Sequence, residues 1–524
     1  MNSIFYPLGQ QHRFHLASRL ARRLALWLGV ALLVVACGGG GGTSRITSST
    51  LTPDPDAAAN PDAPVTPTGP TVTIAGTART IANSLYSYQA TVIGGVGLAF
   101  SWVWGDGSAS AAGNPVQQVW MRPGSYSGSV NATVGSAAAI RPFGVVVVGE
   151  PISSGVLNGC ALTPDGSVAC WGENIDGQLG NGTFSANSPT PVPVTGLTGV
   201  VALTAGGAHH CVLKADRTAS CWGKNEKGAL GDGTAGSTPA TGSTPATTTS
   251  KAIPTPVLDL TDAVALSGGT LHTCAVKVDA TVVCWGGNEA GQLGDGSTTD
   301  QPRPTAVKGL ADVVAISAGK QHTCALGRTG TVHCWGLNAE GQLGNGNIDP
   351  VSPPAPVRVA NLLGAVAIDA GTDHTCALKG DGRAVCWGQN TFGQLGDGTI
   401  GNKSLPVPVL SSSVPLVTLS GAISINAGNR HSCAVKSDGR AACWGENADS
   451  QLGDAAGRKV VASNVPGLTG AVAISAGGAH TCALKTDGSA ACWGRNTDGQ
   501  VGDGSLSAIR IAVTPVLGGA VYWK

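Results

Sequence analysis

The stretch His480–Gly494, HTCALKTDGSAACWG, decides the fold of this chain. Side chains alternate between the two faces of a strand, and Thr486–Gly488 is typical of a three-residue turn that closes with glycine. Counting outward from this turn sets Cys482 opposite Cys492. Directly opposed residues have Cβ atoms about 4.5–5.5 Å apart, close enough for a disulfide. The stretch is therefore predicted to be a β-hairpin with one cysteine on each arm.

The same unit occurs seven times, always with nine residues between its two cysteines. The pairs are Cys160 with Cys170, Cys211 with Cys221, Cys274 with Cys284, Cys324 with Cys334, Cys376 with Cys386, Cys433 with Cys443 and Cys482 with Cys492. A disulfide in each hairpin would contribute about 3 kcal/mol in the chain-entropy model. The alternative is fourteen buried free cysteines, which a reducing compartment would favour. Two copies have Arg217 and Ala280 where the others have the turn glycine, so their turns are expected to be strained or of another type.

The N-terminus favours the oxidised alternative. Residues 1–37 read as an export signal, with four arginines and no acidic residue before the apolar run Leu24–Ala36. An uncleaved signal anchor is the other interpretation. The run ends in Val34–Gly38, VVACG, which resembles the bacterial lipobox. That resemblance implies a lipid on Cys37 and, because glycine follows, a place at the outer membrane or cell surface. Export makes disulfides the expected state of the paired cysteines.

Two segments separate the signal from the repeats. Residues 38–70 are rich in glycine, proline and threonine and are predicted to be a disordered linker. Residues 71–148 carry short alternating runs that indicate a small β-sandwich. Their segment Phe100–Ser108, FSWVWGDGS, followed by Pro123–Tyr126, PGSY, resembles the PKD-type immunoglobulin-like domain. Such a domain is expected to act as a spacer or a weak binder.

Residues 149–524 hold the repeats, whose first cysteines follow one another after 51, 63, 50, 52, 57 and 49 residues. This period, with several short strands in each copy, predicts a propeller or a solenoid. The strings A-G-x-x-H, W-G-x-N and G-Q-L-G-D-G resemble the regulator-of-chromosome-condensation repeat, which implies a seven-bladed β-propeller. The fold class is thus expected to be all-β, a propeller preceded by a sandwich. The C-terminal Pro515–Lys524 begins an eighth copy and could add a strand to the first blade.

The repeated polar residues permit a functional and a structural interpretation. Histidine stands two residues before the first cysteine in six copies, at His209, His272, His322, His374, His431 and His480. Histidine and cysteine on one strand face could bind zinc or copper, but a residue repeated in nearly every copy is better explained by a structural hydrogen bond. The G-D-G strings lack the spaced acids of a calcium loop and indicate turns. Five glutamates near the W-G-x-N turns could line one end of a channel, although solvated turns are the simpler interpretation: Glu173, Glu226, Glu289, Glu340 and Glu446. No catalytic residue, metal site or cofactor is predicted.

Charge argues against a nucleic-acid partner, because 31 basic residues balance 31 acidic ones and loss of the signal would remove four arginines. Nuclear members of the family bind chromatin and act on a small GTPase, but no motif here locates those functional residues. Specificity is expected in the loops that depart from the repeat, Thr234–Ser250, Asn347–Pro356 and Ser411–Leu416. The first of these is serine-, threonine- and proline-rich, and a flexible loop is the simpler interpretation.

The predicted function is a non-catalytic, lipid-anchored scaffold that presents a propeller face to a protein or glycan in the cell envelope. The alternative is an envelope enzyme, or an inhibitor of one, with its site at the channel mouth. An enzyme would need two unlike catalytic groups outside the repeat pattern, and the sequence shows no such pair. A tight acidic cluster at one mouth of the channel would favour the enzyme.

Overall fold

The computed structural model describes residues 71–75, 79–81, 85–93, 99–104, 110–114, 116–119, 124–134, 137–148, 150–163, 165–238, 247–349 and 354–517. The regular elements in these ranges are all strands. The predicted signal, the linker and Cys37 lie outside them. Among the described residues, no helix has the length and apolar character needed to span a membrane.

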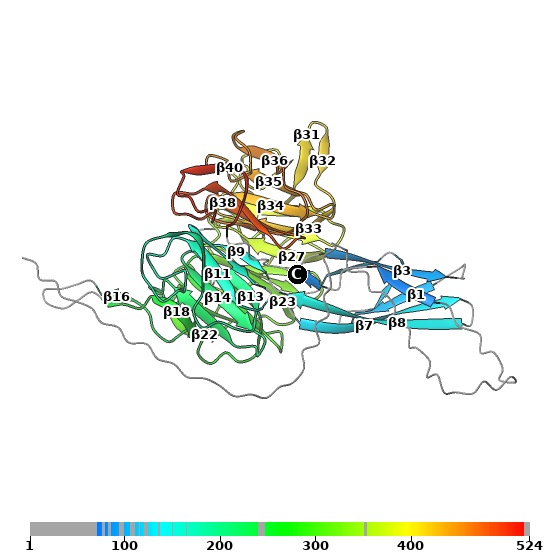
Figure 1. Ribbon diagram of the computed structural model, residues 1–524, viewed down its shortest axis with the longest axis horizontal. Helices are drawn as coiled ribbons and strands as arrows, with labels where there is room; N and C mark the ends of the chain where they lie inside the picture. Colours follow the sequence, from blue (N-terminus) through cyan, green and yellow to red (C-terminus); the bar gives the residue numbers. More distant parts are fainter. Residues whose placement is uncertain are drawn as a thin grey trace, which may run out of the picture. The chain divides into compact units, whose positions relative to one another are not determined.

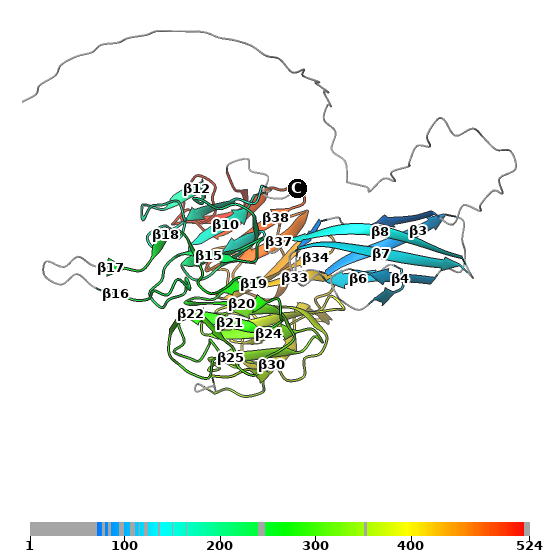
Figure 2. The same ribbon diagram turned by 90° about the horizontal axis from the view of Figure 1, so that it is seen from below.

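Strands between Thr71 and Val148 form two facing sheets (Figure 2). One sheet has the order β1-β3-β6, with β1 Thr71–Ala75, β3 Leu85–Ile93 and β6 Val116–Val119. The other has the order β2-β8-β7-β4-β5, with β2 Arg79–Ile81, β8 Ala137–Val148, β7 Gly124–Val134, β4 Ala99–Val103 and β5 Ala111–Ala112. The buried core contains Tyr88 and the stacked pair Trp102–Trp104, whose ring centres lie 5.4 Å apart. Two sheets around one apolar core make this part a β-sandwich.

Seven four-stranded antiparallel sheets follow, and we call them blades 1 to 7 (Figure 1). Blade 1 consists of β9 Ile152–Ser154, β10 Asn158–Leu162, β11 Val168–Gly172 and β12 Ser188–Pro193. Blade 2 consists of β13 Val200–Ala205, β14 His209–Lys214, β15 Ala219–Gly223 and β18 Lys251–Pro256. Blade 3 consists of β19 Ala263–Gly268, β20 His272–Lys277, β21 Val282–Gly286 and β22 Gln301–Ala306, and blade 4 of β23 Val313–Ala318, β24 His322–Gly327, β25 Val332–Gly336 and β26 Val357–Arg358. Blade 5 consists of β27 Ala365–Ala370, β28 His374–Lys379, β29 Ala384–Gly388 and β30 Lys403–Pro408. Blade 6 consists of β33 Ala422–Ala427, β34 His431–Lys436, β35 Ala441–Gly445 and β36 Lys459–Asn464. Blade 7 consists of β37 Ala471–Ala476, β38 His480–Lys485, β39 Ala490–Arg495 and β40 Ile509–Pro515. The fold is all-β, a seven-bladed propeller preceded by the sandwich.

Each predicted hairpin forms the two central strands of a blade. In blade 7 the register sets Cys482 opposite Cys492, and the two sulfurs form a disulfide. The other six blades have the corresponding disulfide, in the pairs that the sequence predicts. These are Cys160 with Cys170, Cys211 with Cys221, Cys274 with Cys284, Cys324 with Cys334, Cys376 with Cys386, and Cys433 with Cys443. Every blade is thus closed by a bond between its two central strands.

The two hairpins without a turn glycine keep the same turn. Arg217 and Ala280 adopt the left-handed backbone conformation, with φ of 67° and 64°. Their N–H groups close the same turn hydrogen bond as those of the glycines do. These turns are therefore not of another type, and the side chain bears a conformational cost that glycine avoids.

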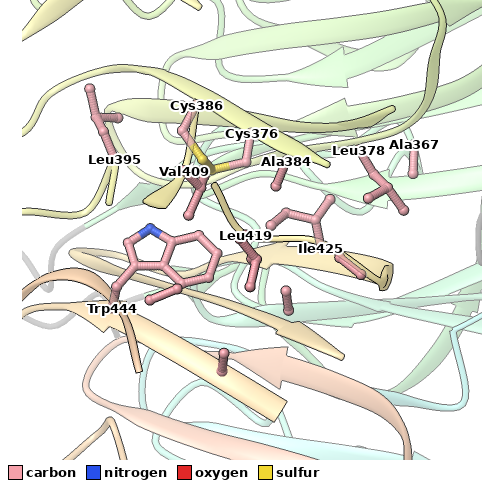
Figure 3. Close-up of a cluster of buried hydrophobic side chains, with 14 residues drawn as sticks. Ala367, Cys376, Leu378, Ala384, Cys386, Leu395, Val409, Leu419, Ile425 and Trp444 are labelled. Atoms are coloured by element: carbon pink, nitrogen blue, oxygen red, sulfur yellow. A yellow bond between two sulfur atoms is a disulfide. The ribbon is translucent and has the colours of Figure 1, made fainter. Parts of the chain in front are cut away.

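The disulfides lie at the interfaces between blades. Cys376 and Cys386 of blade 5 belong to the same buried cluster as Trp444 of blade 6, and Figure 3 shows the indole close to the sulfur pair. The same arrangement recurs around the ring, and Trp171 of blade 1 packs with the blade 7 disulfide. The central strands are buried on both faces, which explains why they contain so few charged residues.

Within the described residues no strand is exchanged where the ring closes, and side chains together with loop backbone groups join blade 7 to blade 1. Every strand of blade 1 lies between Ile152 and Pro193, and β40 pairs with β39 as the outer strand of blade 7. The expectation that Pro515–Lys524 could add a strand to blade 1 is wrong for the described part of that segment, because Pro515 ends β40 and pairs with Ala491. Residues 518–524 lie outside the described residues.

Candidate functional site

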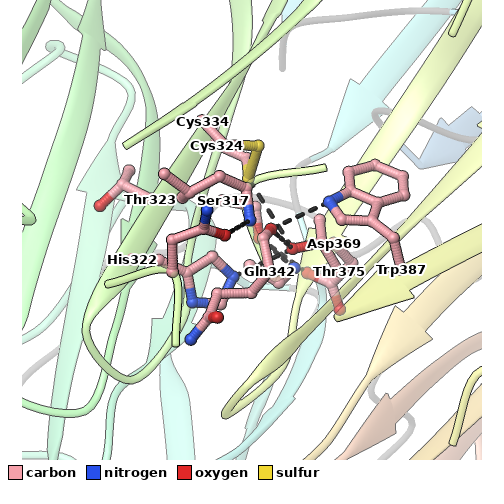
Figure 4. The surroundings of a disulfide bond; sticks show 12 residues. Ser317, His322, Thr323, Cys324, Cys334, Gln342, Asp369, Thr375 and Trp387 are labelled. Carbon is pink, nitrogen blue, oxygen red and sulfur yellow. Dashed lines mark hydrogen bonds between the residues drawn. A yellow bond between two sulfur atoms is a disulfide. The ribbon is translucent and has the colours of Figure 1, made fainter. Parts of the chain in front are cut away.

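Five of the six repeated histidines make side-chain hydrogen bonds to the next blade. His322 of blade 4 donates from Nε2 to Thr375 Oγ1 of blade 5 at 3.0 Å, as Figure 4 shows. Thr375 in turn donates to the backbone carbonyl of Gln342, which also accepts the indole N–H of Trp387. Because the threonine proton goes to the carbonyl, its oxygen must accept from the histidine, which assigns the proton to Nε2. The histidine is therefore committed to the blade interface, as the structural interpretation predicted.

Burial keeps these rings neutral. Removal from water lowers the pKa of His272, His374 and His431 to about 3 and that of His209, His322 and His480 to about 4. Each ring also lies on the glycine of the A-G-x-x-H string. A Cβ on Gly319 would stand 2.4 Å from His322 Cε1, closer than side-chain carbons approach one another. The string is thus a packing motif, in which the glycine makes room for the histidine.

Blade 1 departs from this pattern on both of its sides. Asn158 stands at the histidine position of blade 1, and His210 stands at the threonine position of blade 2. The histidine of this pair therefore lies on the second blade, where His210 Nε2 donates to Asn158 Oδ1 at 2.8 Å. On the other side, blade 1 has Gly159 at the threonine position and offers no hydroxyl to His480. The seam between the first and last repeats therefore has its own set of contacts.

The asparagine of the W-G-x-N string organises the loop that follows it. Asn288 Oδ1 accepts the backbone N–H of Leu293, and its Nδ2 donates to Asp295 Oδ1 and to the Ser297 carbonyl. Asp295 also accepts from the Ser297 amide and hydroxyl. The corresponding bond from a leucine or valine amide occurs in every blade. The G-D-G aspartates are therefore turn residues whose oxygens are already bonded, which disfavours calcium binding. The described residues contain no group of three potential metal ligands.

The five glutamates near these turns do not line the channel. Three of them form ion pairs, namely Glu226 with Lys224, Glu289 with Lys227 and Glu446 with Arg430. The other two, Glu340 and Glu173, accept from side-chain amides. Their carboxylates belong to the loop surface, as the solvated-turn interpretation predicted.

The channel is formed by the seven inner strands and encloses a cavity of about 160 Å³. A polar side chain on each inner strand accepts a backbone N–H from the next blade. In six blades this acceptor is neutral, namely Ser153, Thr204, Ser267, Ser317, Asn426 and Ser475. In blade 5 it is Asp369, whose Oδ2 accepts the N–H of Ala427 at 2.6 Å. These bonds tie neighbouring blades together around the whole ring.

Sequence reasoning missed one pair of residues here. Glu150 and Asp369 both line the channel, where Glu150 is exposed to solvent and Asp369 is partly buried. Reduced solvation in the channel and the charge of Asp369 raise the pKa of Glu150, and burial raises the pKa of Asp369. The signal was present in the repeats, because Asp369 replaces serine, threonine or asparagine and Glu150 replaces valine or isoleucine.

A hairpin stands out from the surface at one of the loops that the sequence marked as variable. β31 Leu410–Ser413 and β32 Leu416–Thr418 form it between blades 5 and 6 (Figure 1). Leu410 and Leu419 at its base are buried, whereas Val414 and Leu416 at its tip are 88% and 76% exposed. We call residues 410–418 the apolar finger. In the Thr234–Ser250 loop, β16 Ser237–Thr238 pairs with β17 Thr247–Thr248, and residues 239–246 lie outside the described ranges.

Known proteins resemble the propeller. A family model described as an RCC1-like domain matches residues 167–519. The chain is 28% identical over 307 residues to the E3 ubiquitin-protein ligase HERC2 of Homo sapiens, covering 58% of this chain and 5% of HERC2. It is 29% identical over 309 residues to the ultraviolet-B receptor UVR8 of Arabidopsis thaliana, covering 58% of this chain and 66% of UVR8. The chain therefore spans less than two thirds of either relative.

Solved structures show the same fold. Yeast RCC1 (Prp20), bound to Kap60, superposes with a TM-score of 0.58 at 21% identity over 67% of this chain and 84% of that one. Human WBSCR16 gives a TM-score of 0.56 at 21% identity over 67% and 95% of the two chains.

Proposed function

The chain belongs to the RCC1-like domain family, and on that premise we propose that it is a non-catalytic scaffold that binds a protein partner through the apolar finger. An RCC1-like propeller supports protein binding in general, and yeast RCC1 was crystallised in complex with Kap60. The relatives do not identify the partner of this chain, because HERC2 is a ubiquitin-protein ligase, UVR8 is an ultraviolet-B receptor, and the chain covers only part of each.

The observation that carries this proposal is the exposure of the finger. Val414 and Leu416 leave most of their apolar surface in water, and no charged residue interrupts the finger sequence LSSSVPLVT. Burying such side chains against a partner yields about 25 cal/mol for each Å² removed from water. The repeated polar residues, by contrast, are bonded within the ring and are not free to recognise a ligand. The departure from the repeat is thus the place where recognition is expected.

The alternative, an enzyme with its site at the channel mouth, has less support. The channel cavity of about 160 Å³ is smaller than the roughly 300–1,000 Å³ of ordinary ligand sites. Its lining contains serine, alanine and isoleucine side chains besides the two carboxyl groups. A scaffold that inhibits an envelope enzyme remains a special case of the proposed function, since it too would bind through the finger. The crosslinking experiment below distinguishes a protein partner from a glycan partner.

We further propose that the scaffold is exported and lipid-anchored at Cys37, with the sandwich as a PKD-like spacer and residues 38–70 as a linker. The support is the lipobox-like VVACG and the seven cysteine pairs, which suit an oxidising compartment. Metabolic labelling with palmitate tests the anchor. The label is expected on the intact chain and lost in Cys37→Ala, and labelling that survives this substitution contradicts the proposal.

A photo-crosslinking amino acid tests the finger. Placed at Val414 of the full chain in cells, it should form an adduct of one discrete mass with a protein. The matched control is Ile175, an aliphatic residue that is 69% exposed in the W-G-x-N loop of blade 1. The captured protein is then purified and titrated against the wild type, Leu416→Asp and Ile175→Asp. Binding should weaken at least tenfold with Leu416→Asp alone. Equal effects of both substitutions, or an adduct only with glycan, would contradict a protein-binding finger.

A further inference from the structure

The outer strand of each blade is an edge, and most of these edges carry proline. An exposed edge can pair with a strand of another chain unless proline, charge or a covering segment prevents it. In blades 1 to 5 a proline precedes the residue that lies opposite the second disulfide cysteine. These prolines are Pro191, Pro254, Pro304, Pro356 and Pro406. Because proline has no N–H, it cannot donate to an added strand.

Blades 6 and 7 have Ala462 and Val513 at this position. In blade 6 the chain itself covers the edge. The finger strand β31 lies beside β36, and Ala462 is buried in the same cluster as Leu419. In blade 7, by contrast, Ile509 and Ile511 of β40 remain 38% and 51% exposed.

A second protection of the edge is also missing from blade 7. In the other six blades, a glycine of the preceding blade donates its N–H to a carbonyl of the outer strand, as Gly504 does to Pro189 at 2.8 Å. All six glycines have positive φ, a conformation that favours glycine. Blade 6 has Ala455 at this position, and among the described residues no backbone N–H of its loop bonds to the Ile511 carbonyl. The edge of β40 is therefore open where the other edges are tied to a loop.

The backbone of β40 faces outward at every second residue. In an antiparallel strand, residues that bond to one neighbour alternate with residues that face the other side. Ala508 and Val516 bond toward the β39 side, to Asn496 and Ala490. The alternation thus directs the backbone groups of Ile509, Ile511 and Val513 away from blade 7.

We propose that β40 is a dimerisation edge, on which the β40 strands of two copies of this chain pair antiparallel around a two-fold axis at Ile511. The two blade 7 sheets then continue into one another. Such a contact is self-complementary, because both copies contribute the same strand.

The sequence of β40 fits a second copy of itself. An axis at Ile511 sets Ile509 opposite Val513 of the second copy, and β-branched residues are favourable cross-strand partners. The same register sets Arg510 opposite Ala512, so no like charges face each other. Arg510 is in addition bonded to Asp503 of its own chain. Neither charge nor shape therefore opposes the pairing.

Cysteine crosslinking of the full chain tests the axis. In Ile511→Cys the two new thiols would lie opposite each other, with Cβ atoms about 4.5–5.5 Å apart, and mild oxidation should join two copies into a covalent dimer. The matched control is Ile253→Cys, which changes an isoleucine that is 50% exposed on the outer strand of blade 2, beside Pro254. It should remain monomeric. Equal dimer yields from both variants, or a link from Ile511→Cys to a different protein, would overturn the proposal.

Sedimentation equilibrium of the full chain tests the association without a crosslink. The wild type should show a reversible monomer–dimer equilibrium that Val513→Pro weakens at least tenfold. The unfolding midpoint of this variant should stay unchanged, because five other blades fold with proline at this position. Ile511→Lys should weaken the dimer equally, since it sets two like charges at the axis and does not depend on tolerance of proline.

The finger variant Leu416→Asp separates this dimer from the proposed partner site. It should leave the monomer–dimer equilibrium unchanged, because the finger lies between blades 5 and 6 and takes no part in β40. A wild type that stays monomeric at every concentration, or a dimer that survives both Val513→Pro and Ile511→Lys, would contradict the β40 dimer. So would a dimer that Leu416→Asp abolishes.

Discussion

The indole Nε1 of Trp171 donates a hydrogen bond to the backbone carbonyl of Gln500 at 2.9 Å, although the two residues lie 329 positions apart. This bond joins blade 1 to blade 7. The same bond joins every other pair of neighbouring blades over a much shorter separation in sequence. The closure of the ring therefore keeps this tryptophan bond, although Gly159 provides no hydroxyl to His480 there.

Substitution at this seam should cost more than at another interface. Between blades 2 and 3 the Ala229 carbonyl accepts from Trp285 and also from the Thr273 hydroxyl, whereas Gly159 offers no hydroxyl to the Gln500 carbonyl. We expect Trp171→Phe to lower the free energy of unfolding by about 1–3 kcal/mol more than Trp285→Phe, since a buried acceptor is left without its donor. Urea unfolding with the disulfides intact measures the difference. Equal losses would show that the seam is not specially dependent on Trp171.

Acid should weaken the ring through its histidines. Burial depresses their folded pKa values, so the unfolded chain binds protons below pH 6.5 while the folded ring does not. Their contribution is present above pH 6.5 and is lost as pH falls toward 4. In His322→Asn, which introduces the residue that blade 1 has at this position, the slope of stability against pH between 6 and 4.5 should decrease by about 1.4 kcal/mol per pH unit. Urea unfolding at several pH values provides the slopes. An unchanged slope would mean that His322 titrates normally in the folded ring.

The glycine beneath each histidine should not tolerate a methyl group. In Gly319→Ala the new Cβ would stand 2.4 Å from His322 Cε1 and 2.5 Å from the Gly371 carbonyl oxygen. We expect a loss of at least about 2 kcal/mol, in the range of overpacked cores. Gly401→Ala is the control, because nothing lies within 4 Å of its added Cβ, and it should change stability by less than about 0.5 kcal/mol. Similar unfolding midpoints for the two variants would refute the packing role of the A-G-x-x-H glycine.

The two turns without glycine offer a gain in stability. Arg217 is exposed and has a φ of 67°, which disfavours a side chain. Arg217→Gly should stabilise the chain by about 0.5–1 kcal/mol, because the strain removed exceeds the added entropy of the unfolded chain. Arg383→Gly, at an exposed position beside the equivalent turn in blade 5, should be neutral or destabilising. A destabilised Arg217→Gly variant would show that the left-handed conformation costs little there.

The local features were predictable from the sequence. The pairing of Cys482 with Cys492 follows from counting outward from one turn, and the W-G-x-N asparagine bonds within its own loop. The contacts of His322 were not predictable in detail, because its partner Thr375 lies in the next blade and is placed by the ring. Glu150 was not predicted as a channel residue, because it precedes the first strand of the propeller, where a charged residue is typical of a linker between two domains. Only the closed ring places it in the same cavity as Asp369.

The central claim is that each of seven blades is closed by its own disulfide, which packs against the tryptophan of the next blade. Peptide mapping by mass spectrometry under non-reducing conditions, on protein isolated from its native compartment, tests it most directly. The account predicts seven linked peptides, each joining the two cysteines of one hairpin, such as Cys482 with Cys492. Free thiols at these fourteen positions, or links between different blades, would contradict it.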